Sequence, residues 1–136
     1  AKDMHITFHR AFDMTRDPYE ALENVMELGV DTILTSGQKN ICIHGADLIK
    51  HLVELSVNKL DIMVGSGIND RNIQKIIDLT HAHSFHLSGK KAMESLMMYR
   101  REALSMGVDH INEYTRWQTD YNIIKDVQGI LLKQSK

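Results

Sequence analysis

The chain alternates four times between a short β-prone run and a helical pattern, and this alternation constrains the fold more than any other feature. The β-prone runs are residues 4–9, 32–35, 60–64 and 84–87. Such alternation predicts parallel strands joined by right-handed crossovers, with helices covering the sheet. We therefore expect an α/β fold, either a small open sheet or part of a (β/α)8 barrel. Functional groups in such folds lie at the carboxyl ends of the strands.

The helical patterns begin and end at recognisable signals. Asp17 can cap a helix that starts with a proline, and Gly29 is placed to end that helix. Asn69 or Asp70 can cap the helix of the third unit. We expect residues 90–117 to contain no clean strand, and a final amphipathic helix to follow.

The length of the chain decides between the two architectures. A whole (β/α)8 barrel takes about 250 residues, and this chain has 136. A β-prone run opens the chain almost at once, which favours a piece of a barrel over an independent open sheet. We expect residues 1–136 to form a single partial domain, about half of a barrel.

Composition excludes several classes of partner. The chain has 16 basic and 18 acidic residues, a formal net charge of −2. This balance gives no electrostatic footprint for nucleic acid or an anionic membrane. One cysteine cannot form an internal disulfide, so a reducing, cytoplasmic setting is the default. No apolar run approaches the roughly 18 residues of a membrane helix.

Polar side chains follow the first and fourth runs. Alternation places Ile6 and Phe8 on the side that faces the helices, and His9 on the side that faces a barrel interior. Imidazole titrates near neutrality, so His9 and His86 are candidate catalytic residues, with Arg10 as a candidate for holding charge. A hydrogen-bonded structural role for inward-facing polar residues remains the alternative.

Two glycine turns predict an anion site. One leads directly into a helix and the other ends the fourth run, and backbone N–H groups in such turns bind anions. Barrels often hold phosphate in the loops after strands seven and eight. Tight turns also need glycine, so both interpretations stay open. The candidate anion-binding residues are Gly65, Ser66, Gly67, Ser88, Gly89 and Arg100, with Lys90 and Lys91 adding positive charge.

Two sets of side chains have the chemistry of metal ligands, but neither defines a site. Three histidines stand close together near the fourth run, and methionine thioethers can hold Cu(I). Methionine more often fills core space, and two of the histidines precede the strand rather than follow it. The metal ligands are therefore left unassigned. The two sets are His81, His83 and His86, and Met93, Met97, Met98 and Met106.

The segment TFHRAFDM at residues 7–14 resembles a characteristic block of the CutC family. Segments 33–38, 63–68 and 85–88 agree with the family in the same order, and the likeness extends over nearly the whole chain. The resemblance implies a cytoplasmic (β/α)8 TIM barrel, often a homodimer, of which this chain is the C-terminal half. It also implies a role in copper homeostasis, with copper ion as the partner.

Two functions follow from these observations. The resemblance implies copper homeostasis and copper binding, whereas the residues favour a barrel enzyme that acts on a small anionic or phosphorylated metabolite. Some members of the family carry cysteines where Gln38 and Leu87 stand here. The thiols that would suit Cu(I) are therefore missing from these two positions.

Overall fold

Four parallel strands form one sheet, in the order β1-β2-β3-β4. The computed structural model describes residues 3–101 and 112–134. Neighbours in the sheet are also neighbours in sequence, as in a segment of a barrel, and the expected α/β fold is confirmed. The strands are β1 (Thr7–Phe8), β2 (Thr32–Thr35), β3 (Asp61–Gly65) and β4 (Ser84–His86).

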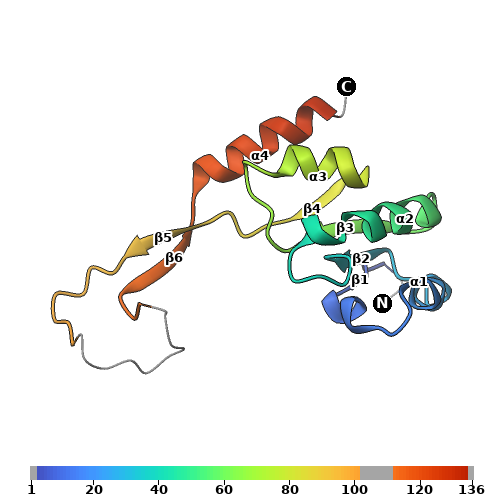
Figure 1. The fold of residues 1–136 in the computed structure, drawn as a ribbon, viewed down its shortest axis with the longest axis horizontal. Helices are drawn as coiled ribbons and strands as arrows, with labels where there is room; N and C mark the ends of the chain where they lie inside the picture. The colour runs from blue at the N-terminus through green and yellow to red at the C-terminus, as the bar shows by residue number, and fades with distance from the viewer. Residues whose placement is uncertain (1–2, 102–111, 135–136) are drawn as a thin grey trace.

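The helices pack against one another in chain order and bury one face of the sheet. Figure 1 shows α4 lying along α3, and α3 in turn lying next to α2. None of the helices in the described residues is long and apolar enough to span a membrane. The helices are α1 (Pro18–Glu27), α2 (Ala46–Ser56), α3 (Ile73–Thr80) and α4 (Tyr121–Gln134). The buried core includes Leu22, Ile33, Ile49, Leu52, Ile62, Val64, Ile73 and Ile76.

The first helix starts as predicted, but the third does not. The Asp17 carboxylate accepts hydrogen bonds from two backbone N–H groups in the first turn of α1, at 2.8 and 3.2 Å. The predicted caps of α3, Asn69 or Asp70, are wrong because Asn72 occupies the N-cap position. The Asn72 side chain accepts from the Asn69 N–H at 2.8 Å, so the chain makes one more turn before the helix begins.

The first strand is much shorter than residues 4–9. The Asp31 carboxylate accepts from the Ile6 N–H at 2.7 Å, and His9 already caps the next element, so only Thr7 and Phe8 pair with β2. Phe8 packs against the core as expected. Ile6 does not face the helices, because it lies outside the strand and is exposed.

An antiparallel hairpin corrects the expectation of no strand in residues 90–117. Strands β5 (Lys90–Glu94) and β6 (Thr115–Thr119) pair with each other and extend away from the sheet and helices (Figure 1). Every residue of β5 is exposed, so its sequence lacks the buried apolar face that would reveal a strand. The base of the hairpin is held by a hydrogen bond from the Asp120 N–H to the Gly89 carbonyl, at 2.9 Å.

Two glycines predict opposite effects of the same substitution. A Cβ on Gly45 would lie against the Ser36 carbonyl oxygen and 2.8 Å from the Gly37 Cα, whereas a Cβ on Gly129 in α4 would meet nothing within 4 Å. We expect Gly45→Ala to lower the free energy of unfolding by about 3 kcal/mol. Gly129→Ala should raise it by about 1 kcal/mol. Urea denaturation of both variants measures this, and equal effects would contradict the close approach at Gly45.

Candidate functional site

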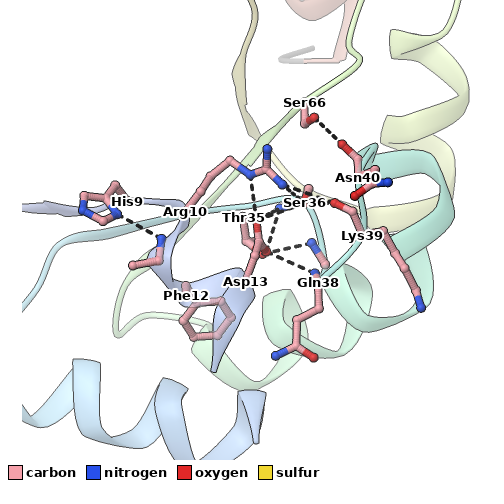
Figure 2. Close-up of polar contacts among 12 residues, drawn as sticks. His9, Arg10, Phe12, Asp13, Thr35, Ser36, Gln38, Lys39, Asn40 and Ser66 are labelled. Atoms are coloured by element: carbon pink, nitrogen blue, oxygen red, sulfur yellow. Dashed lines mark hydrogen bonds and ion pairs between the residues drawn. The ribbon is translucent and has the colours of Figure 1, made fainter. Parts of the chain in front are cut away.

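A buried carboxylate ties the end of β1 to the end of β2. Asp13 lies in a 3-10 turn, η1 (Arg10–Met14), directly after β1. Its Oδ1 accepts from the Thr35 hydroxyl at 2.6 Å and from the Gln38 N–H at 3.1 Å. Its Oδ2 accepts from Arg10 Nε at 2.7 Å and from the Ser36 N–H at 3.1 Å. Figure 2 shows these donors converging on one side chain from two strand ends.

The hydrogen bonds that the Asp13 carboxylate accepts determine its protonation state. Burial alone would raise the pKa of this carboxyl, since its side chain is only 6% exposed. The hydrogen bonds from Thr35, Arg10, Gln38 and Ser36 outweigh burial and hold the pKa below its ordinary value. Asp13 is therefore an ionised carboxylate at neutral pH.

Arg10 is held on two of its three guanidinium nitrogens. Besides the Nε bond to Asp13, its Nη2 donates to the Ser36 hydroxyl at 2.6 Å and to the Lys39 carbonyl at 3.2 Å. Within the described residues, Nη1 has no acceptor. In Figure 2 this third nitrogen points away from Asp13, toward the side where Ser66 lies.

A cavity of about 470 Å³ opens at the carboxyl ends of β3 and β4. It contains five of the six predicted anion-binding residues, together with Arg10 and His86. None of its lining residues is acidic, whereas Arg10 and Lys90 are cationic. The lining residues are Arg10, Leu34, Gly65, Ser66, Gly67, Ile68, Asn69, His86, Leu87, Ser88, Gly89, Lys90 and Ile123.

Hydrogen bonds to a carbonyl and from a hydroxyl hold the turn after β3 in place. Two backbone N–H groups of this turn take no part in them. Ser66 and Gly67 both have positive φ, +77° and +80°. The Ser66 hydroxyl donates to the Asn40 carbonyl at 2.6 Å, and the Gly67 carbonyl accepts from Asn72 Nδ2 at 2.7 Å. Among the residues that the structure describes, the N–H groups of Gly67 and Ile68 have no protein acceptor. Free donors in a glycine turn suit an anion.

Two predicted site residues lie elsewhere. Arg100, beyond β5, donates to the Glu94 carboxylate at 2.7 Å and lies over the Tyr114 ring, so it does not line the cavity. His9 does not line it either. The His9 Nδ1 accepts from the Ala11 N–H at 2.9 Å and caps η1. Their proposed roles in anion binding and catalysis remain predictions.

The network around Asp13 is the part of the site that sequence reasoning missed. The spacing of Arg10 and Asp13 was a usable signal, because residues three apart in a helical turn lie side by side. The involvement of Thr35 and Ser36 depends on the pairing of β1 with β2, which a local pattern does not reveal.

The described residues fit a copper ion poorly. Cys42 is the only cysteine of the chain and is 1% exposed, and burial raises the pKa of its thiol. Residues 3–101 and 112–134 contain no group of three His, Cys, Asp or Glu side chains placed to hold a metal ion. Gln38 donates to the Thr15 carbonyl at 2.8 Å, and Leu87 lines the cavity with an apolar side chain.

Asp13 makes stability depend on pH. A carboxyl with a lowered pKa in the folded state stabilises the fold above its unfolded pKa, and this contribution is lost as the pH falls through the folded pKa. Asp13→Asn should lower the free energy of unfolding by about 2–4 kcal/mol at pH 7, because several donors lose a charged acceptor. The difference from the wild type should shrink below about pH 4. Urea denaturation between pH 3 and pH 7 measures it, and a difference independent of pH would contradict the ionised carboxylate.

Comparison with known proteins agrees with the resemblance of the TFHRAFDM segment. The CutC family profile matches residues 1–91. A CutC family protein of Bacteroides fragilis is 42% identical over 127 residues, which is 93% of this chain and 51% of the relative. The human copper homeostasis protein cutC homolog is 37% identical over 130 residues, which is 95% of this chain and 48% of the relative.

A solved structure gives the same result for the fold. The crystal structure of CutC from Streptococcus agalactiae superposes with a TM-score of 0.58 at 32% identity, covering 62% of this chain and 42% of the other. The chain spans about half the length of the curated relatives it matches. The profile match, the relatives and the shared fold together show that this chain belongs to the CutC family.

Proposed function

We propose that the chain is part of a protein that works in copper homeostasis, and that the cavity at its strand ends binds a small anionic compound. The names of the human and mouse relatives support the first statement. The four-stranded parallel sheet supports the further proposal that this chain is the C-terminal half of a (β/α)8 barrel. In that half-barrel, the cavity lies at the end where the carboxyl ends of the strands meet.

The observation that carries the anion proposal is the charge of the cavity wall. Arg10 and Lys90 are among its lining residues and no acidic residue is, and the Lys90 ammonium lies over the Trp117 ring, 4.7 Å from its centroid. A second cavity of about 510 Å³ lies beside it and is lined by Asp70, Asp120 and Asp126 together with Arg71 and Lys91. The acidic groups of this region are thus kept out of the first cavity. Free N–H donors of the turn after β3 add to the same preference for negative charge.

His86 extends the chemistry that this site can perform. Its side chain lines the cavity with Arg10 and Lys90. An imidazole next to a bound anion can donate a hydrogen bond to it or serve as a proton donor or acceptor. This supports an enzymatic role on a small anionic or phosphorylated metabolite, with His86 as the acid or base.

Neighbouring lysines provide a matched test of anion binding. Lys90 lines the cavity, whereas Lys91 lies outside it, 3.7 Å from Asp120. Inorganic phosphate should raise the melting temperature of the wild type, because a ligand at 100 times its Kd stabilises a fold by about 2.7 kcal/mol. Lys90→Glu should abolish most of this increase, and Lys91→Glu should retain it. Chloride at equal ionic strength is the control.

Two results would contradict the proposal. Phosphate could leave the melting temperature of the wild type unchanged, or Lys90→Glu and Lys91→Glu could respond to it equally. The second result would show that the anion binds by general surface charge rather than in the cavity.

The copper proposal requires a separate measurement. Because the described residues offer one buried thiol and no group of three His, Cys, Asp or Glu side chains, we expect this chain to bind Cu(I) only weakly. In competition with a chromophoric chelator of micromolar affinity, the chelator should keep its copper, and Cys42→Ser should behave like the wild type. Transfer of one equivalent of copper to the chain, lost in Cys42→Ser, would contradict this expectation.

A further inference from the structure

We propose that Asp13 is a positioning residue for the anion site. It fixes Arg10 so that one guanidinium nitrogen is presented to an oxyanion in the cavity, and the ligand class is therefore a compound with a phosphoryl, sulfuryl or carboxylate group. This inference rests on the anion-binding function proposed above.

The hydrogen bonds of Arg10 give it a single orientation. Guanidinium carries N–H donors on Nε and on both Nη atoms. Asp13 takes the Nε donor, and Ser36 and Lys39 take those of Nη2. The two donors of Nη1 remain, and they lie on a side chain that the protein already holds. An oxyanion bound there gains charge-assisted hydrogen bonds without the entropy cost of ordering a free arginine.

Asp13 acts on the ligand through Arg10 and not by contact. Its oxygens are occupied by donors from Thr35, Ser36, Gln38 and Arg10, and the side chain is almost completely buried. A carboxylate in direct contact with an anion would repel it. Here the negative charge lies behind Arg10, where it fixes the cation and leaves Nη1 open to the cavity.

The backbone donors of the turn after β3 are the reason that the ligand should have more than one oxygen. The free N–H groups of Gly67 and Ile68 belong to the turn after β3, whereas Arg10 follows β1. A group with several oxygens can accept from Arg10 and from this turn through different oxygen atoms, whereas a halide ion has a single acceptor atom. Sulfate is therefore a suitable probe, and it stays a dianion over the working pH range, so its own titration does not disturb the measurement.

A double-mutant cycle on sulfate affinity tests this positioning role. Arg10→Lys retains the positive charge but lacks the fork that Asp13 and Ser36 hold. Calorimetric titration with sulfate should show about tenfold or greater weakening for Arg10→Lys and for Asp13→Asn. The double variant should bind no more weakly than Arg10→Lys alone, because Asp13 then has no guanidinium to position. Arg16→Lys, an exposed control outside the cavity, should match the wild type.

Ser36→Ala provides a second variant for the double-mutant cycle if Asp13→Asn does not fold. This change removes one acceptor of Nη2 and the hydrogen bond from the Ser36 hydroxyl to Asp13 Oδ2 at 2.9 Å, but it retains the carboxylate itself. It should weaken sulfate binding severalfold in the wild-type background and have no effect in the Arg10→Lys background. A loss caused only by general destabilisation would be the same in both backgrounds.

The outcomes separate this inference from the proposed function. If sulfate binds the wild type but the effects of Arg10→Lys and Asp13→Asn multiply in the double variant, Asp13 does not act through Arg10 and the inference is wrong. Wild-type sulfate affinity that is unaffected by any of these variants would also overturn it. If the wild type binds neither sulfate nor phosphate, the anion-binding function itself is wrong.

Discussion

The structure depends on one buried negative charge at the end of the first two strands. β1 pairs with β2 at only two residues. This pairing alone does not fix the chain that follows β1. Asp13 supplies the missing constraint, because its carboxylate binds the side chain of Thr35 and the backbone of the turn after β2. The same carboxylate holds Arg10. One carboxylate therefore joins the ends of β1 and β2 and fixes Arg10 beside the cavity.

The remaining features of the site follow from topology. Parallel strands bring the turns after β3 and β4 to the edge where Arg10 lies, so glycine turns and a fixed cation share one cavity. The hairpin begins directly after β4 and brings Lys90 to the same place. Three acidic residues line the neighbouring cavity together with Arg71 and Lys91, and Lys91 lies 3.7 Å from Asp120. The absence of acidic residues from the first cavity is the basis of the anion binding proposed for it.

Much of this arrangement was predictable from the sequence, for reasons that differ between elements. The helix of residues 18–27 carries its own start and stop signals, and the glycine turns mark the strand ends. The hairpin was missed because all of β5 is exposed, so no alternation of apolar residues marks it. The place of Arg100, over the Tyr114 ring, could not be predicted from the sequence because it depends on that hairpin. The partners of Asp13 depend on strand pairing between distant segments, which short-range patterns do not contain.

The proposed site holds a small oxyanion between Arg10 and the turn after β3. The most direct test is a titration of the isotope-labelled chain with sulfate, followed by ¹⁵N–¹H NMR. We expect saturable shifts of the Gly67 and Ile68 amide signals and of the Arg10 side-chain Nε signal, at the same sulfate concentration. Shifts confined to other parts of the chain, such as the first turn of α1, with these three signals unmoved, would contradict it.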